Sequence, residues 1–217
     1  MLKTEWLLEI AESCFKTFPN LERISTYGGA RFIARKGLEE LKMLKAAGIR
    51  KIYLGLETGD DMLLEFMNKG ATSKEILKAA KMITDSSMEL SVTVIQGLGG
   101  EGSWARNAEL TAKLLNEMKP HETRLHNLIL HPDALLSDKV RRGTFHEASR
   151  NEVLMETKEL IRQLNIETEV YTYSSNYLSP RLLDGKLPKD KDYMLNILDF
   201  ALTAPDRRLY LQNTRII

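Results

Sequence analysis

Cysteine is almost absent from this sequence, which has one, Cys14, in 217 residues. A single thiol excludes a disulfide within the chain, and it excludes any metal or cluster site built from several thiolates of this chain. Cys14 lies among apolar residues at helical spacing. We therefore expect a packed helix residue rather than a reactive thiol.

Long apolar runs and an excess of charge of one sign are missing as well. No stretch approaches the roughly 18 apolar residues that span a bilayer, and the N-terminus has no basic region followed by an apolar run. With 31 basic and 30 acidic side chains, the net charge is +1, so bulk charge favours neither nucleic acid nor a membrane as a partner. We expect a cytoplasmic protein that binds neither.

Helical and strand patterns alternate along the chain, and its length and composition predict one globular domain over 1–217, with a C-terminal helix and tail from about 189 to 217. Such alternation predicts βαβ units and therefore an α/β fold with a parallel sheet. The predicted helices are 4–17, 36–48, 60–70, 73–87, 104–118, 151–164 and 189–202; the predicted strands are 21–27, 49–57, 89–97, 123–131 and 167–175.

The number of strands bears on whether the sheet closes. A closed eight-stranded barrel needs roughly 250 residues, and this chain opens on a helix and shows five strands. The sheet is therefore open, or its first elements are missing. The run 89–97 is the most apolar and β-branched, which predicts a strand covered on both faces.

Ligands of parallel sheets bind beyond the carboxyl ends of the strands, so the turns at those ends are the candidate sites. They are 26–31, 55–61, 94–103 and 128–136, and the most unusual residue is Glu57, an acid at the end of an apolar strand. Each turn alone is also typical of an ordinary connection. The turn 97–102 has the spacing G-x-G-x-x-G, but it follows a late strand and no acid closes a strand some 20 residues later, which argues against a dinucleotide site.

The four histidines do not predict a metal site. They are scattered over 121–146, and His126 and His131 are five residues apart on a predicted strand, which places them on opposite faces. A zinc site needs three or four converging ligands.

Three of the turns, taken in order, carry a family resemblance. The run "GLETGDDMLLEFMNKGATSKEIL" (55–77) resembles a "GLESG…D…L…MNKG…T…E" segment of radical S-adenosylmethionine proteins. "SVTVIQGLGGE" (91–101) is similar to their "GxIxGxxE" segment, and "LILHPDALLSDKVRRGTF" (128–145) to their "L.L.PGTPL….GxF" segment. The resemblance runs over roughly 4–205 and is greatest to Fe-S oxidoreductases related to oxygen-independent coproporphyrinogen oxidase.

The resemblance implies a partial six-stranded (β/α) barrel that binds S-adenosylmethionine beside a 4Fe-4S cluster. In that family a CxxxCxxC loop after the first strand holds the cluster, and a Gly-Gly-Glu-like motif after the second takes the methionine amino group. The present chain begins on the helix that would follow the second strand, and it has one cysteine. The resemblance therefore implies an N-terminally truncated relative that lacks the first strands, is not catalytic by itself and has an unknown small-molecule substrate.

The resemblance also implies cofactor contacts at the strand ends. Glu57 and Thr58 fall where the family contacts the ribose or the methionine part of S-adenosylmethionine. Gln96, Gly97 and Leu98 fall where it contacts adenine.

Lys69 falls where relatives place a basic residue that meets the methionine carboxylate; its other interpretation is a cation favoured by the helix macrodipole. Tyr27 and Thr93 depart from the family, which has acids there. The resemblance names no catalytic residue in this chain.

The alternative is a cluster-free, non-catalytic α/β domain that binds a small ligand or associates with itself. A sheet without its first strands has a free edge, and we expect its inner face to be apolar. Both are normally covered, which predicts a homo-oligomer.

Overall fold

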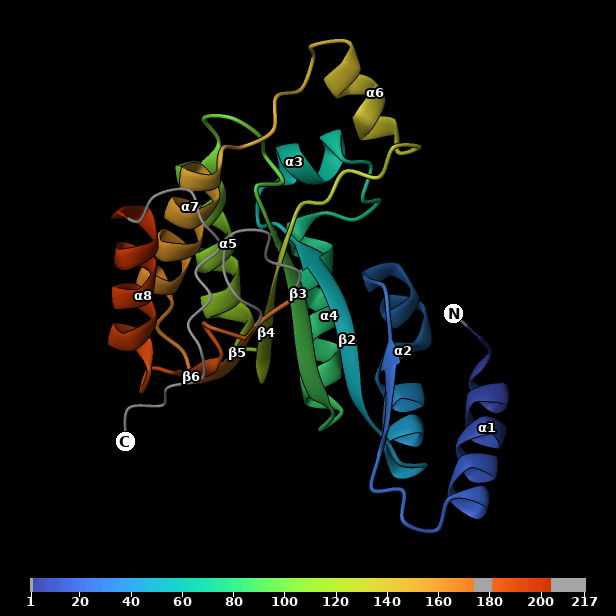
Figure 1. The fold of residues 1–217 in the computed structure, drawn as a ribbon. Coiled ribbons are helices and arrows are strands. Elements are labelled where there is room, and N and C mark those ends of the chain that lie inside the picture. The colour runs from blue at the N-terminus through green and yellow to red at the C-terminus, as the bar shows by residue number, and fades with distance from the viewer. Residues whose placement is uncertain (1, 174–180, 204–217) are drawn as a thin grey trace.

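The computed structural model describes residues 2–173 and 181–203, and it shows an open α/β sheet with helices on one face (Figure 1). The six strands are ordered β1 to β6 as in the sequence; β1 to β5 are parallel and β6 is antiparallel to β5. The strands are β1 (Ile24–Tyr27), β2 (Ile49–Glu57), β3 (Glu89–Gln96), β4 (Glu122–Asn127), β5 (Thr168–Thr172) and β6 (Gly185–Leu187). The predicted parallel sheet is confirmed, and it is not closed.

The helices follow the strands in regular βα alternation. Helices α3 and α6 lie at the carboxyl ends of the strands, and α1 packs outside α2 (Figure 1). The helices are α1 (Thr4–Thr17), α2 (Ala30–Ala46), α3 (Asp61–Phe66), α4 (Ser73–Asp85), α5 (Trp104–Met118), α6 (Leu135–Arg141), α7 (Arg150–Gln163) and α8 (Lys191–Thr203). All seven predicted helices are present; the short α6 and β6 were not predicted.

Helix boundaries differ from the sequence prediction where glycine or asparagine leaves the right-handed region. The sequence predicts a helix from 36, whereas α2 begins at Ala30. Two helical segments, one on each side of Gly37, form α2, and Gly37 itself is not helical, with a φ of +73°. α3 is short, because Asn68 adopts a φ of +52° soon after its end. Cys14 on α1 is half-buried, as a packed helix residue.

The two faces of the sheet differ in kind, because successive side chains of a strand alternate between them. Toward the helices, strand residues are fully buried and mostly apolar: Ile52, Leu54, Leu56, Leu90, Val92, Val94, Leu125 and Val170. The opposite, inner face carries polar side chains from β2 to β4, including Lys51, Tyr53, Arg124 and His126.

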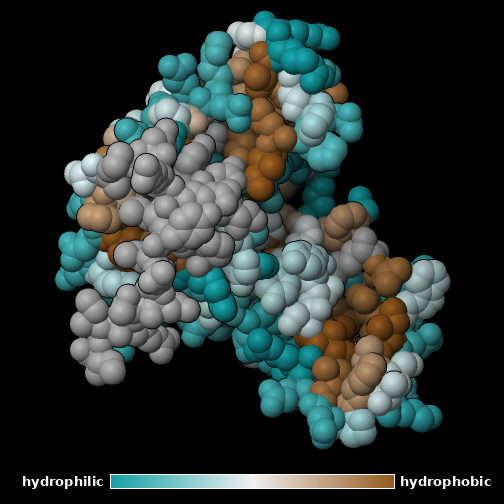
Figure 2. All heavy atoms as spheres, in the orientation of Figure 1, coloured by the Kyte–Doolittle hydropathy of each residue, from teal (hydrophilic) through white to brown (hydrophobic). Residues whose placement is uncertain are grey.

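Two expectations about this sheet were wrong. The inner face is not apolar, because its positions hold charged and tyrosine side chains. β3 is covered by helices on one face only, and its inner residues Glu89, Thr93 and Ile95 are half-buried. Apolar surface gathers instead over α1 and α2 (Figure 2), where Trp6 and Met43 are each 51% exposed.

Candidate functional site

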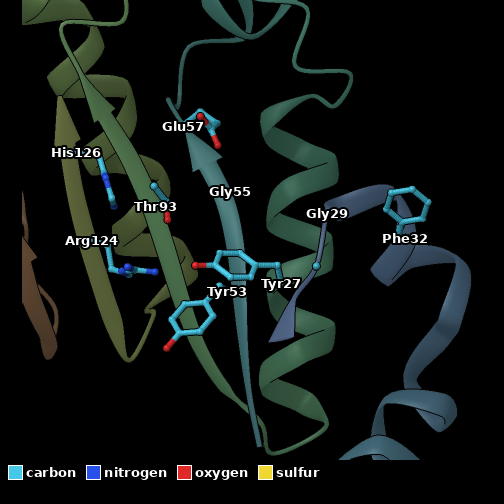
Figure 3. A pocket seen from close by; sticks show the side chains of 10 residues that line it. Tyr27, Gly29, Phe32, Tyr53, Gly55, Glu57, Thr93, Arg124 and His126 are labelled. Carbon is cyan, nitrogen blue, oxygen red and sulfur yellow. The ribbon is translucent and has the colours of Figure 1, made fainter. Parts of the chain in front are cut away.

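The inner face of the sheet opens into a cavity of about 530 Å³. It lies toward the carboxyl ends of the first four strands, the edge at which parallel sheets bind ligands. Figure 3 shows side chains from all four strands projecting into it. The polar and aromatic ones are Tyr27, Tyr53, Glu57, Thr93, Arg124 and His126.

Glu57 is aimed into this cavity by an unusual backbone at the end of β2. The pairing of β2 with β3 shifts register between Gly55 and Glu57. Glu57 then adopts a φ of +66°, and the Thr58 amide donates to the Leu56 carbonyl at 2.8 Å. This three-residue turn with a positive φ at a non-glycine residue is a strained conformation of the kind that clusters at binding sites.

The Glu57 carboxylate lies over Gly55 and is paired with Lys69. A Cβ at position 55 would come within 2.6 Å of Oε1 of Glu57, so glycine leaves the space that the carboxylate occupies. Lys69 Nζ donates to Glu57 Oε2 at 2.8 Å. Among the described residues, Oε1 accepts no hydrogen bond and can receive a ligand hydroxyl or ammonium group.

Behind the strand end, a buried polar network fixes the β2–α3 turn. The Thr58 side chain is fully buried and donates to Asn107 of α5, and the Gly59 amide donates to Thr111 Oγ1 at 2.9 Å. Asp60 caps α3 through the Met62 amide and accepts from Arg106. Burial would raise the pKa of Asp60, but the bonds from Arg106 and Met62 outweigh it and lower the pKa.

The same network reaches the β3–α5 turn through Glu156 of α7. The Glu156 carboxyl accepts from the Gly97 amide at 3.2 Å and from Asn107 Nδ2 at 2.8 Å. Burial raises the pKa of Glu156 to about 8, despite these two donors. Asn107 therefore connects the two turns: it contacts Thr58 after β2 directly, and it contacts Gly97 after β3 through Glu156.

The predicted cofactor residues thus divide into two groups. Glu57 lines the cavity, and Lys69 contacts Glu57. Thr58, Gln96 and Leu98 are buried, at 0, 1 and 2% exposure, and Gln96 accepts from Thr157 of α7. These three side chains lie in the packing behind the strand ends, and their cofactor-binding role stays a prediction, as does that of Gly97.

The floor of the inner face is an ion-pair cluster. Lys51, whose side chain is 3% exposed, pairs with Glu122 and with Glu89, the latter at 3.2 Å. Burial would lower the pKa of Lys51, but the hydrogen bonds from Lys51 to Glu122 and Glu89 outweigh it and raise the pKa. Glu89 also pairs with Arg23, at 3.2 Å.

Above the floor, β4 contributes two residues that the motif analysis missed, Arg124 and His126. The Arg124 guanidinium lies over the rings of Tyr53 and Tyr173, and His126 stacks on Tyr173. The pKa of His126 is lowered, because burial and the Arg124 charge outweigh the opposite effect of Glu57. The available signal was the alternation of charged and apolar residues over 122–127, which places Glu122, Arg124 and His126 on one face.

Comparison with known proteins identifies the domain that carries this site. Residues 23–107 match the radical SAM superfamily. The match contains β1 to β3, three of the four candidate turns and the Glu57–Lys69 pair, so the resemblance read from the motifs is confirmed.

The chain is also similar to individual proteins and to solved structures. A tRNA uridine(34) acetyltransferase of Methanocaldococcus jannaschii is 22% identical over 124 residues, covering 54% of this chain and 22% of the relative. The archaeal Elp3 of Methanocaldococcus infernus superposes with a TM-score of 0.62 at 13% identity, over 82% of this chain and 42% of that one. Coproporphyrinogen III oxidase of Escherichia coli, a radical SAM enzyme, gives a TM-score of 0.59 at 16% identity, over 75% and 37%. The chain spans less than half the length of each of these relatives.

The residues of this chain do not fit the 4Fe-4S cluster that the radical SAM resemblance implies. The sequence has one cysteine, Cys14, and it lies on α1 outside the cavity. Within 2–173 and 181–203, no three histidine, cysteine, aspartate or glutamate side chains converge as metal ligands.

None of the helices in the described ranges combines the length and apolar content that a bilayer-spanning segment needs.

Proposed function

We propose that this chain is the nucleoside-binding part of a radical SAM Fe-S oxidoreductase-like protein, and that it binds S-adenosylmethionine without cleaving it. The observation that carries the proposal is the strained turn at Glu57, which holds a carboxylate over Gly55 and faces it into the cavity. A carboxylate with a free oxygen is a suitable acceptor for two neighbouring ribose hydroxyls.

The remaining parts of the site act through this carboxylate. Lys69 holds one oxygen of Glu57, and the network through Asn107 holds the turns that follow β2 and β3. When bound in the parent family, a 4Fe-4S cluster supplies the electron that cleaves the cofactor. The thiolates for that cluster are not in this sequence, so we derive no such step for this chain.

Calorimetric titration of the chain with S-adenosylmethionine and 5′-methylthioadenosine tests the proposal. We expect both ligands to bind, and Glu57→Gln to weaken each about tenfold, since a charge-assisted hydrogen bond contributes about 1.5 kcal/mol. Glu65→Gln, at an exposed position of α3, is the matched control and should bind as the wild type does. No binding of either nucleoside by the folded wild type contradicts the proposal.

Iron–sulfur reconstitution tests the second half of the proposal. We expect the chain to take up less than one 4Fe-4S cluster per molecule, without the absorption near 400 nm that such clusters give, because Cys14 alone cannot ligate it. A stoichiometric cluster in the monomer would contradict this half and leave the binding result unaffected.

A further inference from the structure

Arg124 is the one inner-face cation of β2, β3 and β4 that has no carboxylate partner among the described residues. Lys51 pairs with Glu122 and Glu89. No ion pair joins Arg124 to any described residue, and its buried Nε finds no hydrogen-bond partner. Arg124 is half-buried; buried polar atoms are normally hydrogen-bonded, and an anionic ligand at this wall of the cavity would supply the missing partner.

Aromatic rings fix the plane of this guanidinium. The Arg124 Cζ atom lies 4.9 Å from the ring centre of Tyr53 and 4.3 Å from that of Tyr173. The His126 ring stacks on the Tyr173 ring, with ring centres 5.4 Å apart and ring planes 10° from parallel. Two rings stacked on an arginine restrain its rotation, so its donors keep the fork geometry that matches a planar carboxylate.

The surrounding charge favours a monoanion. Glu122 lies one layer below Arg124 on the same face, Glu89 lies a further layer down, and Glu169 of β5 pairs in register with Glu122. These three acids outnumber the two cations paired with them, Lys51 and Arg23, so Arg124 leaves no excess positive charge for a phosphate dianion, whereas a carboxylate brings one charge.

The cavity beside Arg124 suits a flat group. Tyr27 and Phe32 line it and are 73% and 44% exposed, which is unusual for large aromatic side chains. Gly29 and Gly55, which also line it, add no side chain beyond the backbone. Figure 3 shows Arg124 reaching across the inner face toward Tyr27 and Tyr53.

From this geometry we infer that Arg124 binds the carboxylate of a small planar molecule, distinct from the nucleoside at Glu57. Arg124 pairs in register with Thr93, whereas Glu57 pairs with Val94, so Arg124 lies slightly below Glu57 and two strands, roughly 9.6 Å, across the sheet from it. We therefore assign the ligand carboxylate at Arg124 to a substrate and not to the nucleoside. This inference names a substrate class for the proposed function, and the carboxylate site itself does not depend on nucleoside binding.

Benzoate and benzamide, which share a shape and differ in charge, test the site in the full chain. Protein-observed NMR titration should show benzoate binding through perturbation of the His126 ring resonances, and benzamide should bind at least tenfold more weakly. Arg124→Gln should weaken benzoate at least tenfold. Arg124→Lys, which keeps the charge and loses the fork, should weaken it severalfold. The control Arg50→Gln, at an exposed position of β2, should leave it unchanged.

Several results would overturn the inference. Equal binding of benzoate and benzamide, benzoate binding unchanged in a folded Arg124→Gln variant, or inorganic phosphate binding more tightly than benzoate would each do so. Displacement of benzoate by S-adenosylmethionine but not by 5′-methylthioadenosine would assign the carboxylate to the methionine moiety and also overturn a separate substrate. Retention of benzoate binding in Glu57→Gln separates this site from the nucleoside site.

Discussion

The Nζ atom of Lys69, which follows α3, lies 2.8 Å from Oε2 of Glu57 at the end of β2, so two of the residues that the family resemblance singles out contact each other. Their side chains are 32% and 21% exposed, which leaves the pair open to a ligand. The contact gives Lys69 a third interpretation besides a cofactor ligand and a helix-end cation, because it can act by holding Glu57.

Replacement of Lys69 separates these interpretations. We expect Lys69→Met to weaken S-adenosylmethionine and 5′-methylthioadenosine equally, about threefold, because the variant loosens Glu57 and removes no contact to a methionine carboxylate. Calorimetric titration of both ligands measures this. Weakening of S-adenosylmethionine alone would show that Lys69 meets the methionine carboxylate directly.

Gly55 provides a steric test of the same carboxylate. Gly55→Ala should weaken nucleoside binding about as much as Glu57→Gln, because the new Cβ would lie 2.6 Å from Oε1 of Glu57 and displace it. Nucleoside affinity unchanged by Gly55→Ala would mean that the observed position of the carboxylate is not required.

The ion-pair floor is expected to contribute to stability. Lys51→Met leaves Glu122 and Glu89 without their buried cation and should lower the free energy of unfolding by about 2 kcal/mol. Urea denaturation followed by circular dichroism measures it. Lys81→Met, which breaks the exposed pair with Glu117, should cost less than about 0.5 kcal/mol. Equal losses in the two variants would contradict a special role for the floor.

Glu156 predicts a pH dependence of stability with a definite sign. Its pKa is raised to about 8 in the folded protein, whereas in the unfolded chain it is near 4.3. Between these values the unfolded state releases a proton that the folded state keeps, so the contribution of Glu156 to stability falls as the pH rises from about 4.5 to 8 and then levels off.

The matched experiment compares the wild type with Glu156→Gln in urea denaturation at several values between pH 5 and 9. The glutamine cannot ionise, so the variant should gain stability relative to the wild type as the pH rises. Parallel pH profiles for the two proteins would show that Glu156 does not titrate in this way.

Self-association stays a prediction, and one of its two arguments has changed. The inner face is polar, so it does not require a cover. β1 is an edge strand of the described sheet, and free edges favour pairing with another chain. Light scattering should show a dimer or larger species, and a monodisperse monomer would count against it.

The predictable part of this fold rests on periodicity. The strand 49–57 and the helices 4–17 and 104–118 match to the residue, because long apolar patterns determine which face packs. β6 and α6 were missed because three and seven residues carry too little pattern.

The candidate site was predictable only in part. Glu57 stands out in sequence because an acid ends an apolar strand, and it lines the cavity as expected. The burial of Thr58 and Gln96 depends on partners 49 and 61 residues away, Asn107 and Thr157, which no local pattern specifies. Arg124 looks like any charged strand residue until the fold shows that no carboxylate in 2–173 or 181–203 forms an ion pair with it.

Neighbouring side chains of β2 point to opposite faces of the sheet, so substitutions at neighbouring positions have different consequences. Even-numbered residues such as Ile52 and Leu54 pack against the helices and determine whether the chain folds, whereas odd-numbered ones such as Tyr53 and Glu57 face the cavity. A single substitution at a cavity-facing position such as Tyr53 can therefore change which ligand is bound without altering the core. Recognition in such a sheet can diversify through evolution one side chain at a time while its architecture is preserved.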